Sequence, residues 1–246
     1  MNDTISLLMK HRSVRKFTNE PVTEEQLETI VAAGQMASSS SHVQAYSVIA
    51  VTDDKLKKEL SELCGNQAYI AECPTFLVWC ADLYRLKTIT EEHYPDKKAF
   101  VDTTESFIIA TVDTALAAQN AAVAAESLGL GIVYIGGIRN RIEEVTRLLE
   151  LPKHVYPVFG MCVGHPDQQT MLRPRLPQKA VLHRNKYSTD AVNEVSNYDV
   201  TMSRYLSERT GGKNDTPWSK LMADKLTQPA RIHMRDYLKE QGFELK

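Results

Sequence analysis

The chain has 246 residues, of which 43% are hydrophobic and 24% charged, and its formal net charge is −2 at pH 7. These values are ordinary for a soluble globular protein, and the balanced charge argues against a general nucleic-acid surface. No apolar signal core or stretch of membrane-spanning length is expected, and the four cysteines lack metal-type spacing, which favours a reducing, cytoplasmic setting.

The first half of the chain alternates predicted helices and strands. Thr23-Glu24-Glu25-Gln26 has the pattern of a capping box, which predicts a helix from this point to the serine run 38–41. A short buried strand is expected over 47–51, followed by a helix that begins at Asp53. The compact apolar run 75–81 predicts a central strand.

The segment 105–128 differs because its apolar residues leave almost no polar face. A helix that is apolar all round is buried, either in the core or against another subunit. Beyond it we expect a strand over 132–135 that ends in Gly136-Gly137, a helix from Asn140 to Leu149, and a strand over 158–163. Strands that alternate with helices in this way indicate a mixed α/β layer structure.

The chain becomes polar from Ser188 onward. Helices are expected over 199–208, 218–226 and 229–241, and they offer few core positions of their own. This tail is therefore expected to wrap over another surface.

Two basic clusters lie far apart in the sequence. His11-Arg12-Ser13-Val14-Arg15 places two guanidiniums, an imidazole and a hydroxyl within five residues, and Arg173-Pro174-Arg175 places two more guanidiniums beside proline. A fork of fixed donors suits a phosphate monoester or the polar edge of a heterocycle. Each cluster alone favours a solvated basic segment. Together with the serine run 38–41, in a slightly acidic chain, they favour a site for one anionic small molecule.

Several motifs of known chemistry are missing from the sequence. The GxG-like element Gly129-Leu130-Gly131 follows a helix and precedes a strand, which reverses the order of a dinucleotide fingerprint. The chain has no Walker motif, no GxSxG elbow and no HExxH pair. Cys80 and Cys162 lie in apolar segments and are expected to be inert thiols. An enzyme of this kind would rely on a bound organic cofactor.

The motifs then identify a family. His11–Arg15 resembles the HRSxR opening of flavin-dependent nitroreductases. The segment 126–131 followed by 134–137 resembles the second motif of that family, and Gly164-His165-Pro166 followed by 173–177 resembles the third. The match runs from Ile5 to about Phe243 and lies in the branch of larger oxygen-insensitive nitroreductases and flavin reductase P.

The resemblance implies an α+β nitroreductase-like fold with a mixed central sheet flanked by helices. It implies a homodimer of single FMN-binding domains, residues 1–246, in which a helical extension, residues 188–246, embraces the partner. FMN would be held noncovalently, and NAD(P)H would reduce it. A ping-pong hydride transfer would then reduce nitroaromatics, quinones or free flavin.

The same resemblance assigns residues to the cofactor. The implied FMN-binding residues are His11, Arg12, Ser13, Val14, Arg15, Ser38, Ser39, Ser40, Gln67, Ala68, Tyr69, Tyr134, Ile135, Gly136, Gly137, Arg173, Pro174 and Arg175. The arginines would hold the phosphate and the polar ring edge, the serines would contact the ring from the other chain, and the glycines would approach it with their backbone. No catalytic side chain and no metal ligand is implied.

Arg209 and Lys213 flank Gly211-Gly212 and are the residues expected to select NADPH. The 2′-phosphate of NADPH is a dianion, so discrimination against NADH needs cations that reach it. Read locally, the same segment is an ordinary Gly-Gly loop after a basic helix end. The resemblance favours NADPH, with some activity toward NADH.

Other functions remain open on the sequence. A dedicated flavin reductase that supplies reduced FMN to a partner monooxygenase would have the same site. A non-catalytic flavin-binding protein and a phosphate-binding protein without flavin are two further alternatives. Read locally, 38–41 is a polar loop after a helix, and Arg173 with Arg175 is a solvated pair.

Overall fold

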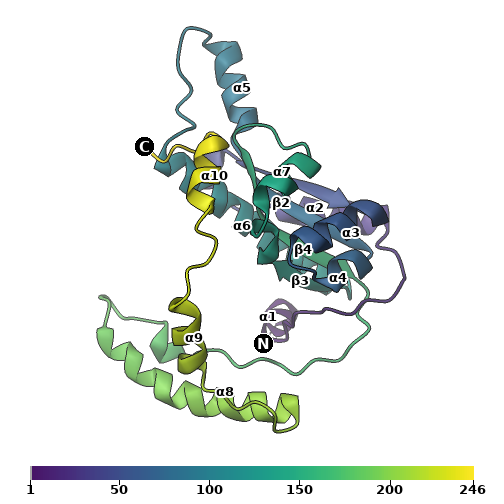
Figure 1. Ribbon diagram of the computed structural model, residues 1–246, viewed down its shortest axis with the longest axis vertical. Helices are drawn as coiled ribbons and strands as arrows, with labels where there is room; N and C mark the ends of the chain where they lie inside the picture. Colours follow the sequence, from purple (N-terminus) through teal and green to yellow (C-terminus); the bar gives the residue numbers. More distant parts are fainter. Residues whose placement is uncertain (1) are drawn as a thin grey trace. The chain divides into compact units, whose positions relative to one another are not determined.

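The computed structural model describes residues 2–246, which form an α+β structure (Figure 1). The chain divides into two compact units: the residues up to Thr170 together with Arg231–Lys246, and Met171–Ala230. The predicted α+β class is confirmed. The single domain 1–246 stays a prediction, because this division does not show whether either unit folds alone. The predicted extension 188–246 contributes to both units.

One antiparallel sheet, with the strand order β1-β2-β4-β3, forms the centre of the first unit. The strands are β1 (Tyr46–Val51), β2 (Thr75–Asp82), β3 (Gly131–Ile135) and β4 (Val155–Gly164). The expected mixed pairing is limited: among the described residues, parallel pairing occurs at a single bridge between Ser13 and Ile132. β2 is buried along its whole length, because it is a central strand covered by helices on both faces.

The helices and 3-10 turns account for most of the remaining chain. They are α1 (Asp3–Met9), α2 (Glu24–Gln35), η1 (Ser40–His42), α3 (Asp54–Leu63), α4 (Ala68–Glu72), α5 (Tyr84–His93), α6 (Thr104–Ser127), η2 (Gly136–Arg139), α7 (Ile142–Leu148), η3 (Gln178–Ala180), η4 (Thr189–Glu194), α8 (Val195–Thr210), α9 (Trp218–Leu226) and α10 (Met234–Glu240).

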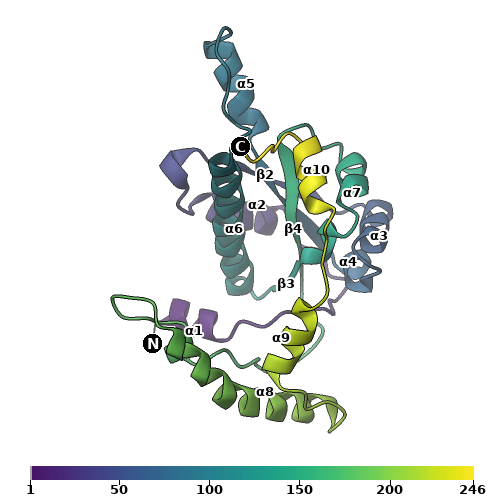
Figure 2. The ribbon, with the colours of Figure 1, turned by 60° about the vertical axis from the view of Figure 1, so that its left-hand side comes forward.

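The alternation of side chains along β2 separates two cores. Leu77 and Trp79 point toward α2 and α6, where they pack against the alanine face of α6. Phe76, Val78 and Cys80 point to the opposite face and pack against α3, α4 and α7. Figure 2 shows the two layers of helices on either side of the sheet. Successive side chains of a strand face opposite sides, so a continuous apolar run supplies both cores at once.

The predicted caps of α2 and α3 are confirmed. The Thr23 hydroxyl accepts from the Gln26 N–H at 3.1 Å, and the Gln26 amide oxygen accepts from the Thr23 N–H at 2.9 Å. Asp53 accepts from the Leu56 N–H at 2.8 Å. Each cap satisfies a backbone donor that the first turn leaves without a partner.

The predicted cap at Asn140 is wrong. Helix α7 begins at Ile142, and Arg141 occupies the cap position without a side-chain cap. The Asn140 side chain has other partners: its amide nitrogen donates to the Cys64 carbonyl at 3.2 Å, and its oxygen accepts from Arg231 Nε at 2.9 Å. A side chain engaged with distant segments is not available to cap its own helix.

Several other boundaries also differ from the prediction. α8 begins at Val195 rather than 199. β4 begins at Val155 rather than 158, because Pro157 lies opposite Cys80 at a register shift that tolerates a residue without an N–H. α10 begins at Met234 rather than 229, because Arg231 has a left-handed φ of 52° that interrupts the helix.

α6 is buried on one face only. Six of its alanines lie in the core, namely Ala110, Ala117, Ala118, Ala121, Ala122 and Ala125. On the other side, Ile108, Val112 and Leu116 are 48%, 48% and 44% exposed. These three residues recur every four positions and therefore form one apolar stripe. By length and composition α6 could also cross a membrane, contrary to the expectation that no stretch has that length. Its alanine face, however, packs on the sheet as that of a core helix does.

The second unit is small and helical. Tyr198, Met202, Tyr205 and Leu206 of α8 are buried and pack with Leu176 and with α9. α8 ends at Gly211, whose φ of 62° is the left-handed conformation that favours glycine.

Candidate functional site

The first basic cluster lies directly beside β3. The Val14 N–H donates to the Ile132 carbonyl at 2.9 Å, and Ser13 forms a parallel bridge with Ile132. Gly131 permits this approach, because a Cβ there would lie 2.7 Å from Val14 Cγ2. Val14 itself is buried, so only its backbone is open to a ligand. The structure thus brings the first and second motifs together.

His11 is held by a carboxylate from α6. Its Nδ1 lies 2.7 Å from Glu126 Oε1, and the His11 side chain is partly exposed. A carboxylate accepts hydrogen bonds only, so Nδ1 carries a proton and Nε2 is the nitrogen left for another partner. Glu126 belongs to the second motif, which gives a further link between the two segments.

The first half of the third motif also meets the first. The Thr18 N–H donates to the His165 carbonyl and the Asp167 N–H donates to the Lys16 carbonyl, both at 2.9 Å. Phe17 and Pro166 form an antiparallel bridge between these bonds. These contacts bring the first motif, the start of β3 and the segment 164–166 together at one end of the sheet, and β3 runs from there toward Gly136-Gly137.

Arg12 and Arg15 have exposed guanidiniums at this convergence. Arg12 Nη1 donates to the Thr170 carbonyl at 3.0 Å, and the other donors of both side chains have no partner within residues 2–246. Neither arginine forms an ion pair with a described carboxylate. Unpaired guanidiniums of this kind fit a phosphate, which accepts two parallel N–H bonds from one fork.

The loop around Gln67 packs against the di-glycine that follows β3. A Cβ at Gly137 would lie 2.2 Å from Gln67 Nε2 and 2.4 Å from the Cys64 carbonyl oxygen, so this position requires glycine. Gln67 Nε2 donates to that carbonyl at 2.6 Å, and the Tyr69 hydroxyl donates to Gln67 Oε1. The structure therefore joins the Gln67 loop to the di-glycine 136–137, while the contact of either segment with FMN stays a prediction.

A pocket of about 350 Å³ lies next to Gly136. It is lined by Ala115, Gln119, Tyr134, Gly136, Arg139 and Phe159. The rings of Tyr134 and Phe159 meet edge to face at 5.1 Å, and the Tyr134 hydroxyl donates to Gln119 Oε1 at 3.5 Å. Burial raises the pKa of Tyr134 above the ordinary value of a tyrosine hydroxyl. Ile135, in contrast, is buried in the core and pairs with Gly160 of β4.

The pocket suits a flat ring with polar edges. Aromatic side chains supply stacking surface, and the amide, hydroxyl and guanidinium supply hydrogen bonds to ring atoms. Gly136 leaves the backbone accessible, because the nearest atom to an added Cβ would be Arg139 Nη2 at 3.3 Å. FMN combines such a ring with a phosphate, so the donors present in the first unit fit this cofactor. Sequence reasoning missed Gln119, Arg139 and Phe159, which carry no motif of their own.

The serines at 38–40 lie apart from this convergence. They follow α2, and their loop is attached to α6, where Asp113 Oδ1 accepts from the Ser40 N–H at 2.9 Å. Within residues 2–246 no hydrogen bond joins this loop to the His11–Arg15 segment or to the di-glycine. Their contact with the ring from another chain stays a prediction.

The second unit contains Arg173, Pro174 and Arg175. Arg175 Nη1 donates to the Arg173 carbonyl at 2.9 Å, and the Tyr198 hydroxyl donates to the Pro174 carbonyl at 3.0 Å. These bonds fix the backbone of the segment and leave both exposed guanidiniums without a carboxylate among the described residues. Their place in a phosphate clamp stays a prediction.

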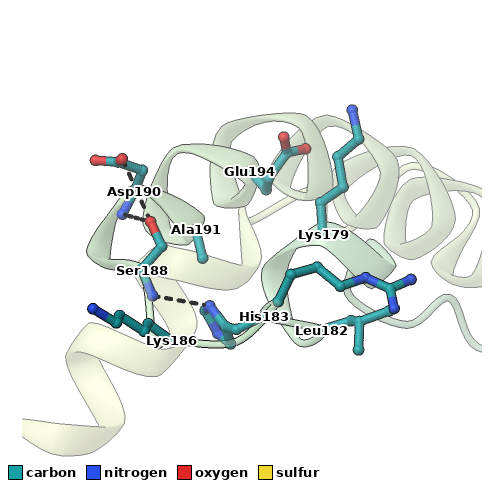
Figure 3. Close-up of a pocket in the computed structure, with 9 residues that line it drawn as sticks. Lys179, Leu182, His183, Lys186, Ser188, Asp190, Ala191 and Glu194 are labelled. Atoms are coloured by element: carbon teal, nitrogen blue, oxygen red, sulfur yellow. Dashed lines mark hydrogen bonds between the residues drawn. The ribbon is translucent and has the colours of Figure 1, made fainter.

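A pocket of about 300 Å³ also occurs within the second unit (Figure 3), lined by Lys179, Leu182, His183, Arg184, Lys186, Ser188, Asp190, Ala191 and Glu194. The Ser188 N–H donates to His183 Nδ1 at 3.1 Å. None of the predicted site residues lines this pocket. The basic residues of this pocket lie within eight positions of the sequence. This local cluster of positive charge is the sequence signal that could have identified the pocket.

Arg209 and Lys213 lie at the predicted Gly-Gly loop. Gly211 and Gly212 have φ of 62° and 81°, and the Asn214 N–H donates to the Thr210 hydroxyl at 2.9 Å to close the turn. Both cations are exposed. The loop geometry is the one expected, while its contact with a nucleotide stays a prediction.

Comparisons with known proteins place the chain among flavin enzymes. The profile of the nitroreductase family matches residues 8–165, and that of the nitroreductase family C-terminal domain matches 173–246. The chain is 46% identical to the FMN reductase (NADPH) of Bacillus subtilis and 45% identical to the NADPH-flavin oxidoreductase of Vibrio harveyi, each over 99% of both chains. The solved NfrA1 nitroreductase from B. subtilis superposes with a TM-score of 0.93 at 45% identity, over 98% of both chains.

Proposed function

The chain belongs to the nitroreductase family, and from this premise we propose that it is an NADPH-dependent oxidoreductase with noncovalently bound FMN. When bound, FMN supplies hydride transfer from the nicotinamide to an acceptor. The observation that carries the proposal is the pairing of Ser13 with Ile132. It places the unpaired guanidiniums of Arg12 and Arg15 along the strand that ends in the di-glycine.

The protein's part in this reaction is to bind and orient. Arg12 and Arg15 hold the FMN phosphate, and Arg173 with Arg175 complete the clamp. The hydrogen bond to Glu126 fixes the orientation of the His11 ring, which leaves Nε2 free to contact a ligand. The remaining FMN contacts are assigned to Ser13, Val14, Ser38, Ser39, Ser40, Gln67, Ala68, Tyr69, Tyr134, Ile135, Gly136, Gly137 and Pro174. No side chain is assigned to proton transfer.

A homodimer is part of the proposal. The apolar stripe of Ile108, Val112 and Leu116 on α6 is supported as an interface, because it is exposed in the single chain and continuous along the helix. In this dimer Ser38–Ser40 of one chain contact the ring held by the other. A cytoplasmic location is also proposed, supported by four buried cysteines that form no disulfide.

Free flavin is the acceptor favoured among the candidates. The names of the B. subtilis and V. harveyi relatives describe reduction of FMN or flavin by NADPH. Nitroaromatics and quinones are further acceptors of the same open ring face. Arg209 and Lys213 provide the preference for NADPH.

Steady-state rates with a panel of acceptors test this function. The FMN-loaded protein is assayed with NADPH or NADH against free FMN, a quinone and a nitrofuran, and oxidation of the nicotinamide is followed by absorbance. We expect turnover with all three acceptors and faster turnover with NADPH. An FMN-loaded protein that oxidises neither nicotinamide with any acceptor would be a flavin-binding protein without this activity.

A further inference from the structure

A buried carboxylate lies beneath the serine loop. Asp113 is only 1% exposed, its Oδ1 accepts from the Ser40 N–H at 2.9 Å, and its Oδ2 accepts from the Ala45 N–H at 3.2 Å. No described cation forms an ion pair with it. Burial and the nearby Asp113 raise the pKa of Tyr46. A buried charge is costly to hold, and here its partners are the two ends of one loop.

The loop between those two ends is strained. Ser41, His42 and Gln44 have φ of 47°, 61° and 50°, so three of its residues occupy the left-handed region without being glycine. That conformation is unfavourable for residues with a side chain and persists only where the surroundings enforce it. Two bonds within the loop are long: the N–H groups of His42 and Gln44 lie 3.4 Å from oxygens of Ser39. The Val43 N–H donates to the Ser40 carbonyl at 2.9 Å, so the Asp113 carboxylate and this turn together constrain the shape of the loop.

We propose that Asp113 is a positioning residue of the flavin site, which clamps Ser40 and Ala45 at the two ends of the strained segment 40–45 and so fixes Ser40, one of the serines assigned to FMN. This inference rests on the proposed function. The clamp also ties the loop to the helix that carries the apolar stripe, because Val112 of that stripe is the neighbour of Asp113. A loop fixed before binding loses less conformational freedom when FMN arrives, which strengthens binding.

Asp113→Asn tests the clamp, because asparagine has nearly the same shape as aspartate. Its amide nitrogen replaces one accepting oxygen by a donor, and this donor would face a backbone N–H. The matched control is Thr114→Val on the same helix. Thr114 is fully buried, and its hydroxyl donates to the carbonyls of Ala110 and Cys80 rather than to the loop. Three quantities are measured for each variant: the Kd of the apoprotein for FMN by fluorescence quenching, the apoprotein Tm, and amide hydrogen exchange across 38–46.

We expect Asp113→Asn to raise the FMN Kd at least about tenfold and to speed exchange at Ser40 and Ala45. Thr114→Val is expected to lower the Tm while leaving Kd and loop exchange as in the wild type. An FMN Kd of Asp113→Asn equal to that of the control overturns the inference and leaves the proposed function standing. A wild-type protein that binds no FMN overturns the proposed function itself.

A second pair of variants tests the clamp from the exposed side, should Asp113→Asn not fold. Ser40→Pro removes the N–H that donates to Asp113, at the first residue of η1, where proline is tolerated. Ser39 before it already has the extended φ and ψ, −127° and 154°, that a residue before proline adopts. Ser40→Ala is the control, since it removes the hydroxyl and keeps the N–H. We expect Ser40→Pro to weaken FMN binding more than Ser40→Ala, and equal Kd values would overturn the inference.

Discussion

Removal of the Arg15 guanidinium should separate FMN binding from folding. Arg15 is exposed, and within residues 2–246 its side chain forms no ion pair and no hydrogen bond. Arg15→Ala therefore removes no described interaction of the protein with itself, and the free energy of unfolding of the apoprotein should change by less than about 0.5 kcal/mol.

The effect on the cofactor should be large. A hydrogen bond to a charged partner contributes roughly 1.5–3 kcal/mol, so its loss should raise the FMN Kd about 10- to 150-fold. Arg15→Ala should then purify largely without FMN and take it up only at raised concentration. Arg12→Ala is a less clean variant, because it also removes the 3.0 Å bond to the Thr170 carbonyl.

Titration of apoprotein with FMN, followed by quenching of flavin fluorescence, measures this change, and a thermal melt of the same sample checks folding. Lys16→Ala is the matched control, since it removes an exposed cation one residue away along the chain. It should leave the Kd within about twofold of wild type if Arg15 acts through a specific contact. Undiminished FMN content in Arg15→Ala, or an equal loss in both variants, would show that the phosphate lies elsewhere.

Four further variants address the choice of donor, the assembly and the backbone. Arg209→Ala and Lys213→Ala should each raise the KM for NADPH about tenfold and leave the KM for NADH nearly unchanged. Steady-state kinetics with both donors measure the two KM values. An equal rise of KM for both donors would show that the loop does not recognise the donor. Leu116→Glu should shift the protein to monomers in sedimentation velocity, because it places a charge in the exposed stripe of α6, and a dimer of wild-type stability would refute that interface. Gly137→Ala should lower the free energy of unfolding by about 1–3 kcal/mol, because the new Cβ would clash with Gln67 and the Cys64 carbonyl. A thermal melt measures the change, and an unchanged Tm would contradict this packing.

Local signals explain which parts of the fold were predictable. The Thr23 capping box and the Asp53 cap involve residues three positions apart, so the sequence alone contains both partners. α5 was missed because its cap position is Leu83, which makes no side-chain cap and gives no start signal. Asn140 was misread because its partners, Cys64 and Arg231, are distant in the chain.

In the candidate site, too, local motifs were predictable from the sequence and long-range contacts were not. The motifs predict which segments bind FMN, and this stays a prediction. The structure shows that His11–Arg15 meets β3 and that the Gln67 loop meets Gly137. The contacts of Asp113 and the pocket beside Gly136 could not be predicted, because they bring together residues distant in the sequence, such as Asp113 with Ser40 and Tyr134 with Phe159. A lone carboxylate in the alanine-rich stretch of α6 was, however, a visible signal of a buried polar contact.

Anaerobic addition of NADPH to the FMN-loaded protein tests the central claim most directly. An NADPH-dependent FMN oxidoreductase should lose its bound-flavin absorbance within seconds, without any added acceptor, and should regain it when free FMN or a quinone is supplied. A flavin spectrum that stays unchanged in the presence of excess NADPH would contradict the account and leave a protein that binds flavin without using it.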